Sequence, residues 1–258
     1  MTKNRKLLNA KLDYSALSQN EKYNFSLRYA LSIYPLNAIY TFIPKNACSS
    51  LRFSVAVSNG FIEDLKDFHW IHQNNETFNP TQREIARASY TFVVLRCPFT
   101  RVASCFFDQI VGGDFDFTDS SGVKLSISFK DFLKIIKSQN RVDRNEHWRN
   151  QSDFLHYEEY DEYFSLELFN DAVNKLEKKG IKVFDTRVEM NHSLQGFKKN
   201  NGNFTNTKEI EIKKMKEHGN IPSYKSMFDK ETIELVNEIY SDDIALYKKY
   251  FRKDFLLF

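Results

Sequence analysis

The chain carries the same three-part pattern twice: an apolar run typical of a buried strand, a short polar turn, and a segment with helical spacing. In the first copy, the apolar residues 38–43 stop at Pro44. A polar turn then leads to Cys48, Leu51 and Val55, which recur at the spacing of a helix. This pattern predicts a strand, a turn and a helix from about residue 48 to 58.

The second copy begins with residues 90–95 (YTFVVL), which predict another buried strand. The turn that follows contains Pro98, which suits the first turn of a helix. Beyond it, Val102, Phe106 and Ile110 recur every four residues and predict that this helix continues. Strands that alternate with helices are typical of layered α/β proteins.

The rest of the chain extends this α/β interpretation. Helices are predicted near residues 20–32 and over 129–138, 166–179 and 230–251, and a third parallel strand is predicted at 181–184 after Gly180. The predicted fold is α/β, with a mostly parallel central sheet flanked by helices. We expect one domain over residues 1–258, with a polar lead-in at 1–35 and a core at about 36–258.

Composition limits the partners. The 37 basic and 34 acidic residues leave a net charge of +3, which is too balanced to indicate nucleic acid and fits a small anionic ligand better. Three cysteines at no metal-ligand spacing indicate reduced thiols in a reducing compartment. No apolar run approaches the ~18 residues of a membrane span, and no signal-peptide region is evident. We therefore expect a soluble, cytoplasmic protein.

The two predicted turns carry the polar chemistry. The first offers Lys45 and the hydroxyls of Ser49 and Ser50, but it has no glycine, so it is not a GxxxxGK[ST] nucleotide loop. The second offers Arg96 and, further along, the Ser104 hydroxyl, a combination suited to a phosphate monoester. In α/β sheets, ligands bind beyond the carboxyl ends of the strands. The sequence therefore predicts two anion sites and a ligand with two phosphates.

These segments resemble motifs of sulfotransferases that use 3′-phosphoadenosine 5′-phosphosulfate (PAPS). PKNACSSLR resembles their 5′-phosphosulfate loop, and LRCPFTRVASCF resembles their 3′-phosphate motif R-x-P-x-x-R-x-x-S. EHWRNQSDFL is similar to the H-W-x-P-Q segment of carbohydrate sulfotransferases that modify chondroitin, and IYSDDIALYKKY to their terminal helix. The resemblance spans about residues 40–251. Cys97 and Asn150 depart from it, standing where many members have Asp and Pro.

The resemblance implies a P-loop-like nucleotide-binding fold, PAPS as sulfuryl donor and a hydroxyl acceptor on a carbohydrate. It also implies that Lys45 neutralises the charge that grows on the leaving oxygen. A sulfuryl group carries less charge than a phosphoryl group, so no metal is expected. The predicted donor-binding residues are Lys45, Asn46, Ala47, Cys48, Ser49, Ser50, Arg52, Arg96, Arg101 and Ser104.

Three histidines are candidates for the base that takes the acceptor proton: His69, His72 and His147. The resemblance favours a histidine between the two nucleotide motifs, which would be His69 or His72. The carboxylate alternatives in the same interval are Glu63, Asp64 and Glu76. Trp148, Arg149 and Gln151 are candidates for lining the acceptor site.

Two other functions remain open from the sequence. A P-loop-type nucleotide kinase is disfavoured because the loop lacks glycines and the 90–95 strand ends without a Walker-like Asp. A module that binds a nucleotide or a sulfated glycan without turnover is the non-catalytic alternative.

Overall fold

The computed structural model describes residues 4–11, 16–74, 76–118, 120–188 and 196–258. Its contacts divide the chain into two compact units. Unit 1 comprises Met1–Arg96 and Gln151–Asn191, and unit 2 comprises Cys97–Asn150 and His192–Phe258. The expectation of a single domain stays a prediction.

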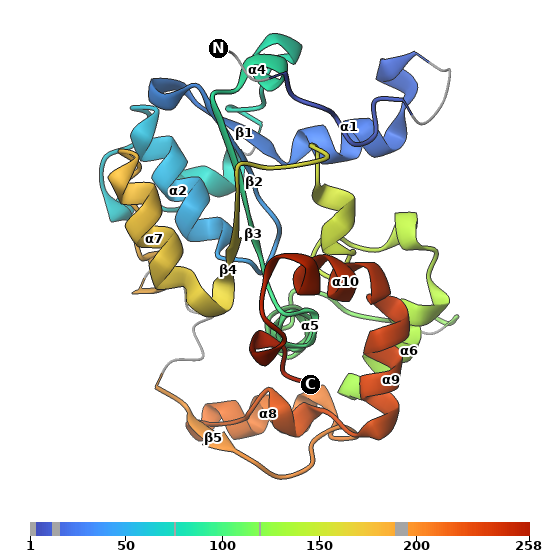
Figure 1. The fold of residues 1–258 in the computed structure, drawn as a ribbon. Helices are drawn as coiled ribbons and strands as arrows, with labels where there is room; N and C mark the ends of the chain where they lie inside the picture. The colour runs from blue at the N-terminus through green and yellow to red at the C-terminus, as the bar shows by residue number, and fades with distance from the viewer. Residues whose placement is uncertain (1–3, 12–15, 75, 119, 189–195) are drawn as a thin grey trace. The chain divides into compact units, whose positions relative to one another are not determined.

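Unit 1 is built on a four-stranded sheet in the order β1-β2-β3-β4 (Figure 1). The strands are β1 (Ala30–Ile33), β2 (Ala38–Thr41), β3 (Tyr90–Leu95) and β4 (Glu162–Ser165). β1 pairs antiparallel with β2, whereas β2, β3 and β4 are mutually parallel. The predicted α/β class with a mostly parallel, helix-flanked sheet is therefore confirmed.

The described residues of unit 1 form five α-helices. They are α1 (Glu21–Arg28), α2 (Cys48–Ser58), α3 (Trp70–Gln73), α4 (Gln82–Arg87) and α7 (Phe169–Lys178). In Figure 1, α2 and α7 lie on one side of the sheet and α1 on the other. Both sides of the central strands are thus covered, which explains why β3 reads as a continuous apolar run and not as an alternating one.

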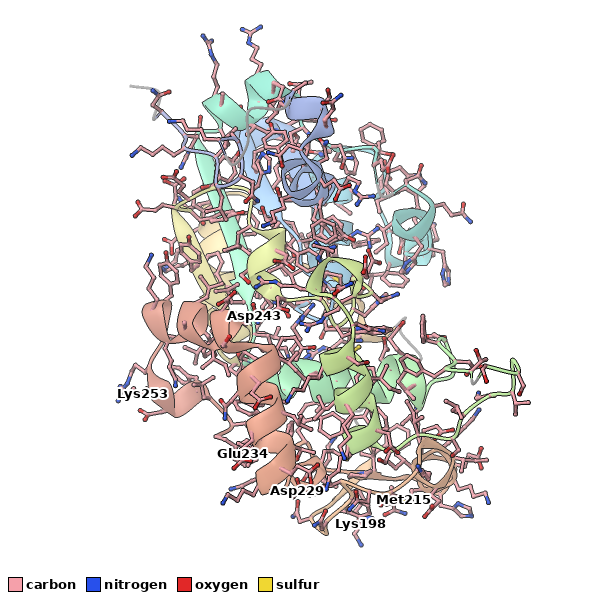
Figure 2. The ribbon with its side chains drawn as sticks, turned by 90° about the vertical axis from the view of Figure 1, so that its right-hand side faces the viewer. Lys198, Met215, Asp229, Glu234, Asp243 and Lys253 are labelled. Carbon is pink, nitrogen blue, oxygen red and sulfur yellow. The ribbon has the colours of Figure 1, made fainter. Side chains whose placement is uncertain are left out.

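The helices and strands of unit 2 surround a long aromatic core. α5 (Pro98–Cys105) continues into a π-helix at Phe106–Ile110. The remaining elements are α6 (Phe129–Ser138), β5 (Lys198–Asn200), α8 (Glu209–Glu217), β6 (Asn220–Pro222), α9 (Lys230–Ile239) and α10 (Ser241–Tyr250). β5 and β6 form a two-stranded parallel sheet. Figure 2 labels Glu234 on α9 and Asp243 on α10.

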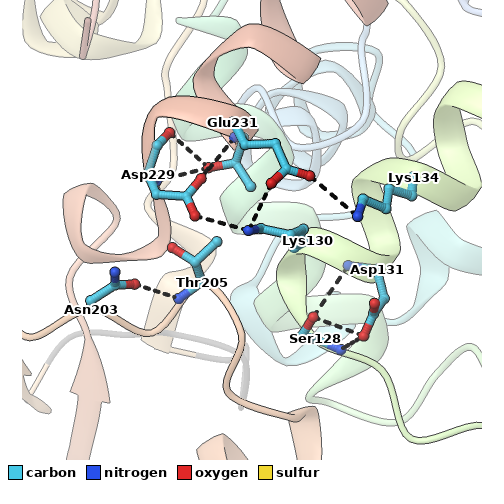
Figure 3. A network of polar contacts seen from close by, with 9 residues as sticks. Ser128, Lys130, Asp131, Lys134, Asn203, Thr205, Asp229 and Glu231 are labelled. Atoms are coloured by element: carbon cyan, nitrogen blue, oxygen red, sulfur yellow. Dashed lines mark hydrogen bonds and ion pairs between the residues drawn. The ribbon is translucent and has the colours of Figure 1, made fainter.

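A charged network connects α6 to the start of α9 within unit 2 (Figure 3). The Lys130 ammonium lies 3.0 Å from a carboxylate oxygen of Asp229 and 3.1 Å from one of Glu231, and Lys134 lies 3.2 Å from Glu231. Asp229 also caps α9 by accepting the Thr232 N–H. The same carboxylate therefore caps the N-terminus of α9 and attaches this helix to α6, so this network has a structural role.

The prediction of a strand at residues 181–184 is wrong. The third parallel strand is β4, and Ile181 instead completes the C-terminal cap of α7. Gly180 takes a φ of 92°, its N–H binds the Glu177 carbonyl at 2.9 Å, and the Ile181 N–H binds the Leu176 carbonyl at 3.0 Å. This is the Schellman arrangement, in which an apolar residue after the glycine packs back on the helix.

Several predicted boundaries also need correction. The helix predicted at 20–32 ends at Arg28, and β1 follows it. The helix predicted over 230–251 is two helices, α9 and α10, separated at Tyr240. Tyr240 leaves helical geometry with φ −118° and ψ 29°, and its buried hydroxyl donates to the Trp148 carbonyl at 2.7 Å. That contact within unit 2 explains the break, which periodicity alone could not predict.

A buried histidine lies in unit 1 away from the predicted site. His156 is 1 % exposed, and its Nδ1 lies 2.8 Å from the Ser26 hydroxyl. Because that hydroxyl donates to the Tyr23 carbonyl, it accepts from Nδ1–H, which makes Nε2 the bare nitrogen. Nε2 has no partner among the described residues. Protonation would leave a buried charge unpaired, and burial accordingly lowers the pKa of His156 to about 4.

We expect His156 to make unit 1 sensitive to acid. Its folded-state pKa lies below the ordinary value of 6.5, so the folded state binds fewer protons and loses stability as the pH falls from about 6.5 to about 4. His156→Asn keeps a nitrogen donor for Ser26. Between pH 7 and 4, the free energy of unfolding of this variant should fall by about 3 kcal/mol less than that of the wild type. Urea unfolding at both pH values measures this, with the exposed His218→Asn as control. An unchanged pH dependence in His156→Asn would contradict this assignment.

Candidate active site

The loop between β2 and α2 has an unusual backbone for a segment without glycine. Lys45 and Ala47 both have positive φ, at 72° and 58°. Successive residues that alternate in and out of the left-handed region turn their N–H groups toward one concavity, an arrangement that binds anions. The left-handed conformation costs a residue with a Cβ about 1–2 kcal/mol. The loop is therefore held in this shape by its surroundings.

The start of α2 extends the same concavity. Ala47 is the N-cap residue, and its methyl side chain provides no capping hydrogen bond. The first-turn N–H groups of a helix have no partner within the helix, so here they remain open to a ligand. Lys45, Ser49 and Cys48 are half-buried beside them. The turn thus combines backbone donors, a lysine and a hydroxyl.

Arg96 joins this loop to the end of β3 within unit 1. It follows directly after β3, is 9 % exposed, and its Nη1 donates to the Lys45 carbonyl at 2.8 Å. β2 and β3 are parallel, with Thr41 opposite Val93, so their carboxyl ends lie at the same edge of the sheet. The structure therefore brings together Lys45 and Arg96, the leading residues of the two predicted turns.

Asn46 is the residue of this loop between Lys45 and Ala47, and it is completely buried. Its Nδ2 donates to the Val94 carbonyl at 2.9 Å and to Gln151 Oε1 at 2.7 Å. Gln151 is also buried, and its amide forms two hydrogen bonds with the backbone of Arg96. The Asn46 side chain therefore points into unit 1. Gln151, which the sequence suggested for the acceptor site, thus contacts Asn46 of this loop and the backbone of Arg96.

Ser50 and Arg52 have contacts that lead away from the loop. The Ser50 hydroxyl lies 2.9 Å from that of Thr186, and it also accepts the Thr186 N–H. Arg52 donates to the Ile71 carbonyl, and its guanidinium lies 5.1 Å from the ring centre of Phe42. Arg52 thus connects α2 with α3, the short helix between the two nucleotide motifs.

His69 and His72 lie at α3 and are exposed. Their rings lie 5.7 and 5.2 Å from that of Phe68 and 6.3 Å from each other. His69 helps to line a depression of about 340 Å³, together with Phe61, Ile62, Lys66, Asp67 and Trp70. The depression therefore combines aromatic rings with charged groups and a histidine. Of the carboxylate alternatives, Asp64 accepts the Lys66 N–H and thereby caps a short 3-10 helix (Leu65–Asp67).

Arg101, Ser104 and His147 belong to unit 2. Arg101 is 2 % exposed and donates to the Arg149 carbonyl at 2.7 Å and the Glu146 carbonyl at 3.3 Å. His147 Nδ1 lies 2.9 Å from Asn145 Oδ1. Arg101 therefore shapes the backbone of the 146–149 segment. Ser104 is half-buried on α5.

Among the residues that the structure describes, no group of three or more His, Cys, Asp or Glu side chains is arranged to hold a metal ion. Across the same residues, no helix is long and apolar enough to span a bilayer.

A mostly parallel, helix-flanked sheet with a lysine-bearing turn at the carboxyl end of β2 defines an α/β protein. Residues 36–251 match the model of the Sulfotransferase family, and the chain belongs to that family. Comparisons with curated proteins and with solved structures gave no match. The family prediction from the sequence is therefore confirmed, and sulfuryl transfer is the reaction class that it assigns.

The left-handed backbone at Ala47 leads to a stability prediction. Ala47→Gly should leave the free energy of unfolding unchanged or raise it by up to about 1 kcal/mol, because glycine adopts positive φ without steric cost. The control is Ala86→Gly at an exposed position of α4, where glycine should cost about 1 kcal/mol. Urea denaturation measures both. Equal losses at the two positions would mean that residue 47 is not left-handed.

Proposed function

We propose that this protein transfers the sulfuryl group of PAPS to a hydroxyl group of a carbohydrate. The observation that carries the proposal is the hydrogen bond from Arg96 to the Lys45 carbonyl, which joins a glycine-free anion-binding loop to an arginine at the end of the next parallel strand. A nucleotide with phosphate groups at both its 5′ and 3′ positions matches two such neighbouring sites.

The residues of unit 1 suggest how the donor would be held. The loop N–H groups, the start of α2 and Ser49 would bind the 5′-phosphosulfate. Arg96, which follows directly after β3, would bind the 3′-phosphate through its guanidinium, because that group carries several N–H donors and a positive charge. The assignments of Arg101 and Ser104 to the same phosphate are predictions from the motif. For Arg101, the buried backbone contacts favour a role in positioning the 146–149 segment.

PAPS supplies an activated sulfur whose leaving group is adenosine 3′,5′-bisphosphate. The acceptor oxygen forms a bond to sulfur as the bond to the bridging phosphate oxygen breaks. Lys45 would neutralise the negative charge that develops on that oxygen, a contribution of about 3–4 kcal/mol for a preorganised donor. A base takes the acceptor proton, and His69 is our first candidate because it lines a depression. His72, His147 and the carboxylates Glu63, Asp64 and Glu76 are the alternatives.

The chemistry of these residues requires no metal to offset phosphate charge, since Lys45, Arg96 and the loop N–H groups offer positive charge themselves. None of the three cysteines, Cys48, Cys97 and Cys105, forms a disulfide. We propose that the protein works in a reducing compartment such as the cytoplasm, on a donor and an acceptor that are both small molecules or glycans.

Adenosine 3′,5′-bisphosphate should bind without Mg²⁺ and stabilise the protein. At a concentration 100 times its Kd, a ligand that binds only the folded state adds about 2.7 kcal/mol, which corresponds to a rise in Tm of roughly 5 °C or more. Thermal unfolding with EDTA measures this shift, with ATP and Mg²⁺ as the comparison that tests the kinase alternative. No shift at millimolar bisphosphate, or a shift only with ATP and Mg²⁺, would refute the proposed donor.

Lys45→Met should lower turnover by about 10²–10³-fold and weaken bisphosphate binding far less, because the lysine charge acts mainly on the transition state.

One of His69→Asn and His72→Asn should lose turnover with bisphosphate affinity intact, since a base contacts only the acceptor. Transfer of radiolabelled sulfate to a panel of glycans measures turnover, and calorimetry measures affinity. If only His147→Asn is inactive, the base lies in the HWRNQ segment.

A further inference from the structure

We propose that Gln151 and Asn46 are positioning residues that hold the Lys45 loop and Arg96 in the arrangement that binds the donor. The inference rests on the proposed function, but it assigns these two buried amides a role that neither the motifs nor the family match provides. Neither side chain is exposed by more than 1 %. Both therefore act through Lys45 and Arg96 and not through direct contact with the donor.

The first argument is where β3 loses its neighbours. β2 pairs with β3 up to Thr41 opposite Val93, and β4 pairs with it up to Ser165 opposite Leu95. Beyond these points, the backbone groups of β3 need other partners, because buried polar groups without partners are costly. Asn46 Nδ2 binds the Val94 carbonyl at 2.9 Å. The side-chain amide thus continues the hydrogen bonding of the sheet by one position.

The Gln151 amide does the same at the next residue. Its Oε1 accepts the Arg96 N–H at 3.0 Å, and its Nε2 donates to the Arg96 carbonyl at 2.9 Å. A side chain that matches both backbone groups of one residue imitates a paired strand. Arg96 follows immediately after β3, so this pair fixes the backbone from which its guanidinium reaches the Lys45 carbonyl.

The two amides are also connected, and their orientations are forced. The Val94 and Arg96 carbonyls both require donors, so Asn46 must present Nδ2 to Val94, and Gln151 must present Nε2 to Arg96. Gln151 Oε1 then accepts from both Asn46 Nδ2 and the Arg96 N–H. This arrangement leaves Asn46 Oδ1 without a partner among the described residues. An unpaired buried acceptor is costly, and the hydrogen bonds that the two amides form with Val94 and Arg96 compensate for it.

The consequence concerns the strained loop. Asn46 stands between Lys45 and Ala47, the two residues with positive φ. Its N–H binds the Ile43 carbonyl at 3.1 Å, and its side chain is held by β3 and Gln151. A backbone in a costly conformation persists only when neighbouring contacts determine it. Asn46 and Gln151 supply those contacts, so the donor-binding loop is formed before the donor arrives.

The test uses Gln151→Met, because methionine has a similar volume but cannot form the three hydrogen bonds of the Gln151 amide. Those bonds join Gln151 to Asn46 Nδ2 and to the N–H and carbonyl of Arg96. We expect its bisphosphate Kd, measured by calorimetry, to rise at least tenfold. In the ligand-free protein, amide hydrogen exchange should accelerate in peptides covering residues 43–51 and 94–97. The matched control is Tyr157→Phe, which removes a different buried hydrogen bond of unit 1, to the Ile85 carbonyl. It should leave both the Kd and the exchange of these peptides unchanged.

A second variant keeps the test decisive if Gln151→Met does not fold. Asn46→Ala removes the loop contact but leaves the Gln151 and Arg96 pair in place, and it should raise the Kd and the exchange of residues 43–51 alone. In the double variant, the losses in affinity should not add, because the two amides act as one unit. Unchanged exchange in the loop, or equal acceleration throughout unit 1, would overturn the inference. Wild-type protein that does not bind bisphosphate would overturn the proposed function instead, and hydrogen exchange would still decide the role of Gln151.

Discussion

The parallel pairing of β2 with β3 is the constraint on which the site of unit 1 depends. Parallel strands end at the same edge, so the turn after β2 and the residue after β3 become neighbours without any further device. Both strands are buried on their two faces, which leaves little freedom to shift their register. The hydrogen bond from Arg96 to the Lys45 carbonyl is the direct result of that pairing.

The Lys45 loop contains no glycine, so its left-handed backbone conformation costs free energy. A glycine loop would adopt positive φ freely but would also be flexible in the absence of a ligand. With Lys45 and Ala47 in these positions, the loop is strained but less free to adopt other shapes. Ordering a flexible loop on binding reduces affinity, whereas a preorganised loop avoids that loss. If the loop binds the donor as proposed, the polar contacts beneath it would contribute to that binding without touching the ligand.

Local sequence signals predicted the elements whose pattern is self-contained. α2, β3 and α6 have the bounds that their apolar spacing and their flanking turn residues indicated. β4 was missed because its sequence, EYFS, is short and begins with a charged residue, and it forms only through pairing with β3. Ile181 gave a false strand signal because a helix cap also requires an apolar residue. Tertiary pairing decided each of these cases.

The candidate site also combines features with a local sequence signal and features that depend on tertiary contacts. Lys45 and its loop could be predicted because a strand, a turn and a helix N-terminus are adjacent in the sequence. The contacts of Gln151 could not be predicted, since it lies 105 residues from Asn46 and 55 from Arg96. The motif R-x-P-x-x-R-x-x-S likewise does not distinguish its two arginines. A guanidinium carries five N–H donors, so the same side chain suits a phosphate or a set of backbone carbonyls. Arg96 reaches a carbonyl of the Lys45 loop, whereas Arg101 reaches carbonyls of the 146–149 segment, so only the folded structure distinguishes the two arginines.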